Sequence, residues 1–347
     1  MTPLEKSNAL KILASKHNNL SDVPYEYRDD RDIVLYAVSK KGSVESLYYA
    51  SDRLKDDKEL VLKAVKNDGN SLLAASERLQ NDKQVVMAAI KGMCPFPYIK
   101  DSLKQDKDIV DLAIAKGGWD LEYLSLEYRN NKELVSIAVS HHGTALQYAS
   151  KTLRNDKEIV LKAVKDNGYA IQYASRELQH DREVALTAIK STGLALENIP
   201  HFNNDKEIVL AAVETYGMAI TVASSELRND YNIGCAAIKN TQYALKYVSD
   251  TLKNNIDIVL PVVQKSGNLL EHASLELQNN PEVVLAAIES SHGKALKYAS
   301  NELKNNIDIV SAAFKLDKNA LEHVSEEMQL QFLNTNSTKI KKVNKKI

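Results

Sequence analysis

The chain has 347 residues, of which 44% are hydrophobic and 26% are charged, and its net charge is −1. These values are typical of a folded soluble protein and exclude a highly charged, disordered chain. The two cysteines, Cys94 and Cys235, exclude a disulfide framework and a Cys-x-x-Cys metal clip, so we expect a reducing, cytoplasmic compartment. The N-terminal stretch lacks the apolar run of a signal peptide, and no run of about 18 apolar residues predicts a membrane span.

A unit of about 25 residues recurs along the whole chain. Each copy opens with an acidic residue or asparagine, at Asp30, Asp57, Asp82, Asp106, Asn131, Asp156, Asp181, Asp205, Asp230, Asn255, Asn280 and Asn306. Such regular self-similarity predicts a solenoid, in which each repeat packs on its neighbours. We therefore predict an all-α solenoid of about 13 helix-turn-helix repeats, a right-handed superhelix with the architecture of HEAT and TPR proteins.

The two ends of the array differ from its centre. Residues 1–29 form a degenerate copy, interpreted as an N-terminal capping repeat, and residues 30–328 hold the twelve regular repeats of one solenoid. Residues 329–347 are expected to form a closing segment and a basic, disordered tail with five lysines. Without these five charges the net charge is −6, which argues against a groove that follows phosphates. Weak contact of the tail with anionic lipid is the alternative to a solvated end.

The first half of each repeat is predicted to be an amphipathic helix. In the copy that opens at Asp156, the apolar residues at positions 159, 160, 163 and 164 follow a helical period. Asn155 and Glu158 have the spacing of a capping box. Gly168 predicts a left-handed C-cap, after which a second, shorter helix is expected.

A small residue and a serine recur together in the second half of the repeat, as at Ala149 and Ser150. The small residue allows two helices to approach closely, and the serine is expected to hydrogen-bond the local backbone. A catalytic residue is not needed in ten copies, so the serines are interpreted as structural. They are Ser51, Ser76, Ser125, Ser150, Ser175, Ser224, Ser249, Ser274, Ser300 and Ser325.

The residue before this pair is tyrosine or histidine in most copies. This column consists of Tyr49, Tyr123, Tyr148, Tyr173, Tyr247, His272, Tyr298 and His323. One interpretation is a stack of aromatic residues that pack between repeats with their polar tips outward. The other is a ladder that lines a concave binding groove, because tyrosine is enriched in recognition surfaces.

Two breaks in the repeat are candidates for partner binding. Prolines disrupt the copy that begins at residue 82, and Phe96, Tyr98 and Trp119 are predicted to be neighbours there. The second break contains His201 and Phe202. The alternative is local repair, in which proline shortens a helix and aromatic side chains fill the gap.

No catalytic, metal-binding or cofactor-binding residues are predicted. The histidines do not form a His-x-x-x-His pair, and glycine motifs for phosphates, dinucleotides or a nucleophile elbow do not occur. Carboxylates are abundant, but most stand where helices begin. We expect a protein that is not an enzyme and uses no cofactor.

The pattern Asp-Lys-Glu-(Ile/Leu)-Val-Leu-x-Ala-Val-x-x-x-Gly, followed by Ala-Leu-x-Tyr-Ala-Ser, is clearest at residues 57–81, 156–180 and 205–229. It resembles the helical repeat family known as domain of unknown function 4116, over nearly the whole chain and more loosely at residues 1–29, 92–104 and 329–347. Such repeats are known from amoebae, their giant viruses and effector proteins of bacteria that live inside amoebae and macrophages. The resemblance implies an all-α repeat protein and an effector or effector regulator, and it transfers no catalytic residues.

The sequence thus predicts a monomeric, non-enzymatic scaffold that binds a protein partner through a concave or edge surface. The candidate contact residues are Phe96, Tyr98, Trp119, Tyr123, Tyr148, Tyr173, His201 and Phe202. The resemblance adds the expectation that the partner is a host or bacterial protein and that the chain is translocated into a host cytosol. A nucleic-acid-binding helical repeat protein is the main alternative, and an enzyme with an unrecognised site is the other.

Overall fold

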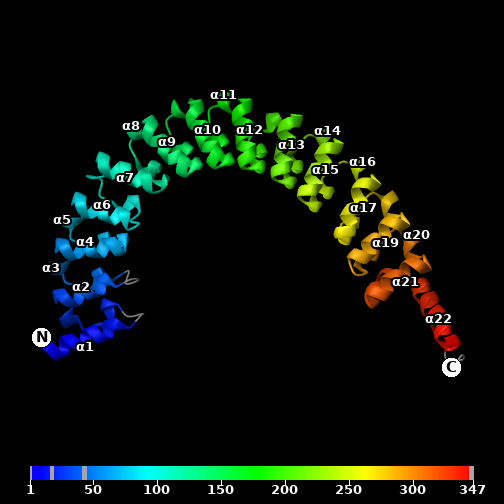
Figure 1. Cartoon of the computed structure of the whole chain (residues 1–347), viewed down its shortest axis with the longest axis horizontal. Helices are drawn as coiled ribbons and strands as arrows, with labels where there is room; N and C mark the ends of the chain where they lie inside the picture. The colour runs from blue at the N-terminus through cyan, green and yellow to red at the C-terminus, as the bar shows by residue number, and fades with distance from the viewer. Residues whose placement is uncertain (1, 16–18, 41–44, 344–347) are drawn as a thin grey trace. The chain divides into compact units, whose positions relative to one another are not determined.

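The computed structural model describes residues 2–15, 19–40 and 45–343, and the side chains of these residues except Trp119 and residues 335–343. This described part contains α-helices and 3₁₀-helices and no strand, so the predicted all-α repeat fold is confirmed (Figure 1). The chain divides into two compact units, one of Met1–Asp166 with Tyr173–Ser175 and one of Asn167–Gln172 with Arg176–Ile347. The sequence predicted a single solenoid. Each unit is built from the same repeat, as expected where a repeat contacts only its neighbours.

A typical repeat contains three helical pieces, whereas the sequence predicted two. A long α-helix, such as α4 (Lys58–Asn67), is followed by a 3₁₀-helix, η4 (Gly69–Ala74), and by a one-turn helix, α5 (Glu77–Gln80). Ala75 has extended backbone angles, φ −68° and ψ 160°, and separates η4 from α5. The predicted second helix is therefore split at the residue before the serine.

The first unit contains seven long helices among its described residues. They are α1 (Pro3–Ala14), α2 (Arg31–Ser39), α4, α6 (Lys83–Lys91), α7 (Lys107–Gly117), α9 (Lys132–His141) and α10 (Lys157–Asp166). Its short helices are η1 (Leu20–Asp22), η2 (Tyr25–Tyr27), η3 (Ser46–Tyr49), α3 (Asp52–Lys55), η4, α5, η5 (Phe96–Tyr98), η6 (Trp119–Tyr123), α8 (Leu126–Arg129), η7 (Gly143–Tyr148) and η8 (Leu153–Asn155). The helix η9 (Gly168–Tyr173) contains residues of both units.

The second unit repeats this order. Its long helices are α12 (Arg182–Ser191), α13 (Lys206–Thr215), α15 (Tyr231–Asn240), α17 (Ile256–Lys265), α19 (Pro281–Ser290), α21 (Ile307–Leu316) and α22 (Glu326–Val343). Its short helices are α11 (Arg176–Gln179), η10 (Gly193–Asn198), η11 (Pro200–Phe202), η12 (Gly217–Val222), α14 (Ser225–Arg228), η13 (Gln242–Lys246), α16 (Asp250–Lys253), η14 (Gly267–His272), α18 (Leu275–Gln278), η15 (Lys294–Tyr298), α20 (Asn301–Lys304) and η16 (Lys318–His323).

The core runs along each row of long helices. In the first unit α1, α2, α4, α6, α7, α9 and α10 pack one on the next, in the order that Figure 1 shows. Most long helices bury an i, i+1, i+4, i+5 stripe, which in α13 is Ile208, Val209, Ala212 and Val213, all 0% exposed. Burial of one such branched side chain contributes about 1.5–3 kcal/mol, so this stripe holds the repeats together.

The capping box predicted between Asn155 and Glu158 does not form, because the long helix begins one residue later. The side chain of Asp156, not Asn155, accepts hydrogen bonds from the amides of Glu158 and Ile159, at 3.0 and 3.3 Å. The acidic residue or asparagine that opens each repeat is therefore the N-cap itself. A capping box is present at the N-terminal helix α1, between Thr2 and Glu5.

Most of the recurring glycines allow neighbouring repeats to approach closely. The prediction that they form left-handed C-caps is therefore wrong for most of them. Among the glycines of the described residues, only Gly118 and Gly293 have positive φ angles, 74° and 90°. At Gly193, a Cβ atom would lie 2.7 Å from the carbonyl oxygen of Ala212 in the next repeat. A side chain there would push two repeats apart.

The C-terminal segment is helical where the sequence predicted a disordered tail. The helix α22 continues to Val343, and Phe332 packs against Phe314 of α21 with ring centroids 4.9 Å apart. Its first turns thus bury an apolar side chain on the last repeat. The lysine side chains of the tail lie outside the described residues, so the predicted contact with lipid stays a prediction.

Candidate protein-interaction surface

The recurring serine joins neighbouring repeats, which its predicted local role did not include. The amide of Ser249 donates to the carbonyl oxygen of Arg228 at 3.0 Å, and its hydroxyl donates to Oδ1 of Asn229 at 2.6 Å. The same hydroxyl accepts from the amide of Leu252 at 3.2 Å and so caps α16. The serine-to-asparagine bond recurs at Ser150 with Asn130, Ser175 with Asn155, Ser224 with Asn204, Ser274 with Asn254, Ser300 with Asn279 and Ser325 with Asn305. These serines are structural.

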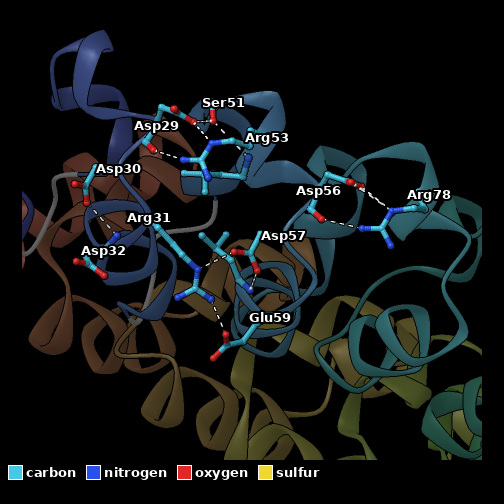
Figure 2. A network of polar contacts seen from close by, with 12 residues as sticks. Asp29, Asp30, Arg31, Asp32, Ser51, Arg53, Asp56, Asp57, Glu59 and Arg78 are labelled. Atoms are coloured by element: carbon cyan, nitrogen blue, oxygen red, sulfur yellow. Dashed lines mark hydrogen bonds and ion pairs between the residues drawn. The ribbon is translucent and has the colours of Figure 1, made fainter.

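Ion pairs connect the starts of successive long helices. A cation at the first position of one helix reaches the N-cap carboxylate of the next, as Lys132 reaches Asp156 at 2.8 Å. An equivalent pair joins Lys206 to Asp230 at 2.5 Å. Another joins Arg31 to Asp57 at 2.7 Å, as Figure 2 shows. The paired lysines lower the pKa values of Asp156 and Asp230 below their ordinary value. These cations are therefore engaged in joining repeats.

A second set of charges follows the serines. In Figure 2, Ser51 and Arg53 converge on Asp29, and Arg78 pairs with Asp56 at 3.0 Å. Three repeats have asparagine in place of this aspartate and an acidic partner: Asn204 donates to Glu226 at 3.2 Å, Asn254 to Glu276 at 2.8 Å and Asn279 to Glu302 at 2.9 Å. At these joints a donor on one repeat thus meets a carboxylate on its neighbour.

The tyrosine column occupies the last position of successive 3₁₀-helices. In the first unit Tyr49 ends η3, Tyr123 ends η6 and Tyr148 ends η7. Tyr98, which the sequence placed only in a break, ends η5 and belongs to the same column. Tyr98 is 50% exposed and Tyr123 is 46% exposed, so part of each ring is available to a partner.

The tyrosines also contact one another's repeats. Desolvation, together with a hydrogen bond to Glu122, raises the pKa of Tyr148, and the phenols of Tyr123 and Tyr173 are close enough to add to this shift. Tyr148 thus contacts Glu122 of the preceding repeat and stays partly exposed, and the binding role of the column stays a prediction. We call the row Tyr98, Tyr123, Tyr148 and Tyr173 of the first unit the tyrosine face.

The first break has a buried ring at one residue and an exposed ring at another. Phe96 is 1% exposed and lies two residues before Tyr98, the core position that Leu121 and Leu146 occupy before Tyr123 and Tyr148, so its prediction as a partner-binding residue is wrong. Tyr98 is half exposed, and η5 packs against η6. Trp119 begins η6, but its side chain lies outside the described part, so its role stays a prediction.

The second break joins two repeats through stacked rings. His201 stacks on His180 with ring centroids 3.8 Å apart, and its Nε2 lies 3.1 Å from the carbonyl oxygen of Gln179. Phe202 is half-buried, and its ring centroid lies 4.5 Å from that of His201. These contacts give His201 and Phe202 a structural role, and partner binding there stays a prediction.

Each unit has a hollow beside its 3₁₀-helices. In the first unit a hollow of about 440 Å³ lies between η3 and η4, and in the second a more open one of about 710 Å³ is lined by Lys246, Lys253, Glu271 and His272. No cluster of three metal-binding side chains occurs in the part of the chain that the structure describes. None of the described helices is long and apolar enough to cross a membrane.

Stacked α-helices joined by serine and ion-pair contacts, with tyrosines at the ends of the 3₁₀-helices, define a helical repeat protein with an extended, partly aromatic surface. The chain belongs to the family described as domain of unknown function 4116. Its family model matches residues 7–55, 43–80, 57–104, 106–154, 131–179, 156–203, 181–228, 205–253, 235–278, 255–292 and 280–329. No curated protein and no solved structure matches the chain.

Proposed function

We propose that this chain is a non-enzymatic scaffold that binds a protein partner through the tyrosine face. The supporting observation is the row of tyrosines that end successive 3₁₀-helices and keep part of each ring exposed. Tyrosine provides a large, rigid contact area at little entropic cost and a hydroxyl that hydrogen-bonds, which is why it is common in binding surfaces.

A protein partner is favoured over a nucleic acid by the use of the cations. Arg31, Lys132 and Lys206 pair with carboxylates of the next repeat, and a phosphate would have to compete with these contacts. A nucleic-acid groove needs cations that are free to neutralise phosphates. We further propose that the chain works as a monomer in a reducing cytoplasm. An effector role rests on the family resemblance alone.

The test is a double variant, Tyr148→Ser with Tyr173→Ser, used as bait in cytosolic extract beside the wild-type chain. We expect the double variant to lose partners that the wild-type chain retains, because serine removes the ring. Tyr36→Ser is the matched control, since Tyr36 is 43% exposed but lies on α2, away from the tyrosine face.

Thermal unfolding of the wild-type chain and both variants separates binding from folding. If the double variant loses thermal stability but retains every partner, the tyrosine face only packs repeats together and the proposal is wrong. Equal losses of partners in Tyr36→Ser and in the double variant would also contradict it.

A further inference from the structure

The tyrosine column of the first unit lacks a ring between Tyr49 and Tyr98. Tyr49 ends η3 and Tyr98 ends η5, but the helix between them, η4, ends with Ala74. Alanine keeps the backbone of the repeat and removes the ring. The position next to it along the chain, Leu73, is 53% exposed.

The hollow of about 440 Å³ lies where this ring is missing. Its lining includes Ala74, Leu73, Tyr48 and Tyr49, and the nearly buried Ser71. The rings of Tyr48 and Tyr49 meet edge to face, with centroids 5.5 Å apart and an interplanar angle of 86°. Glu45 and Asn70 add further polar groups to the lining. Aromatic walls with a few polar groups are typical of sites that receive a ring.

Cations hold the two aromatic walls in place. The guanidinium of Arg28 lies 5.6 Å from the ring centroid of Tyr49, and the ammonium of Lys55 lies 5.5 Å from that of Tyr48. Arg28 is itself fixed, because it donates to the carbonyl oxygens of Val23 and Ser21, both at 2.9 Å. The hollow is therefore supported by contacts of its own.

We propose that this hollow receives an aromatic side chain of a partner polypeptide, which occupies the place of the tyrosine that the column lacks at Ala74. A guest ring gains the edge-to-face contacts that the phenols of the column make, and the Ser71 hydroxyl offers a hydrogen bond. A polypeptide fits better than a free small molecule, because Tyr49 of the lining belongs to the same column as the tyrosine face, to which the proposed function assigns a protein. The inference rests on that proposed function.

The experiment titrates the full chain with the peptide Ac-Gly-Tyr-Gly-NH2 by ligand-observed NMR. We expect binding by the wild-type chain, and binding weaker by about tenfold or more for Ala74→Tyr, since the new ring fills the hollow from within. Val222→Tyr is the matched control, because Val222 ends η12 at the equivalent position of the second unit, and its affinity should equal that of the wild type. A second variant, Tyr48→Ala, removes a wall that is 67% exposed and should also weaken binding.

Three results would overturn the inference. The first is equal affinity of the wild-type chain and Ala74→Tyr for the tyrosine peptide. If Ala74→Tyr does not fold, equal affinity of the wild-type chain and Tyr48→Ala counts instead. The second is equal affinity for Ac-Gly-Leu-Gly-NH2, which would show that the hollow does not select a ring. The third is p-cresol binding as tightly as the tyrosine peptide, which would assign the hollow to a free small molecule. Because no partner from extract is involved, these failures are distinct from a failure of the Tyr148 and Tyr173 variants.

Discussion

At the scale of single residues, Asp120 departs from the packing rule of the repeat. The equivalent positions of the next two repeats are Ala145 and Ala170, which are 1% and 0% exposed. Asp120 places a carboxyl at this crowded position, and burial raises its pKa from 3.8 to about 6. The charged form of Asp120 thus opposes folding.

We predict that Asp120→Ala stabilises the chain at neutral pH. Because the pKa of Asp120 is higher in the folded state, the unfolded state loses this proton first as pH rises above 3.8. The loss of folding stability due to Asp120 therefore grows between pH 3.8 and about 6 and is complete above pH 6. The gain should be on the order of 2 kcal/mol at pH 7.5 and should vanish near pH 3.5. Urea unfolding at both pH values measures it, with the exposed Asp101→Ala as control; a pH-independent difference would contradict the prediction.

Two glycines of the second unit test the close approach of the repeats. Gly193→Ala should destabilise by roughly 2–4 kcal/mol, because the new Cβ meets the fixed backbone oxygen of Ala212. Gly234→Ala is the contrast, because its new Cβ meets the flexible end of the Leu252 side chain. Gly234 lies inside α15, where alanine is a better helix former than glycine by about 1 kcal/mol. Chemical unfolding of both variants measures the difference. Similar effects of the two substitutions would show that the approach at Gly193 is not tight.

At the scale of elements, the joint between repeats combines a helix cap with a contact across the repeat. In the joint at Ser249, one hydroxyl accepts from Leu252 and donates to Asn229. We expect Ser249→Ala to cost about 1–2 kcal/mol, because it removes the cap and leaves the Asn229 acceptor unpaired by serine. A double-mutant cycle with Asn229→Ala should show a coupling energy of about 0.5–1 kcal/mol. Strict additivity would mean that the hydroxyl acts only as a cap.

The sequence predicts the parts of the repeat that depend on its period and misses those that depend on contacts between copies. The stripe of α13 follows from apolar spacing alone. The bond from Ser249 to Asn229 spans 20 residues, so a pattern within one copy cannot reveal it. The split of the second helix is hidden because Ala75 suits both extended and helical backbone. Tyr98 was separated from its column because prolines interrupt the repeat there, although counting 25 residues back from Tyr123 would have placed it in the column.

At the scale of the whole molecule, ion pairs between helix starts recur in both units and link stability to pH. Asp57, Asp156 and Asp230 each have two partners, the amides of their own helix and the cation of the preceding repeat. Asparagine at such a position keeps the hydrogen bonds from the helix amides but loses the ion pair. The chain itself makes this exchange where Asn255 follows a repeat whose long helix begins with Tyr231, which carries no cation.

We therefore predict that Asp156→Asn with Asp230→Asn, one change in each unit, flattens the acid limb of the stability profile. The paired lysines lower the pKa of both carboxyls below 3.8, so their contribution is complete above that pH and is lost as pH falls through the lowered values. At pH 7 the cost should stay below about 1 kcal/mol per pair, since the lysines are largely exposed. Asp317→Asn is the control, because Asp317 caps η16 and asparagine can replace it there. Unfolding from pH 2 to pH 7 measures the profile, and an unchanged acid limb in the double variant would mean that the lysines do not stabilise the joints.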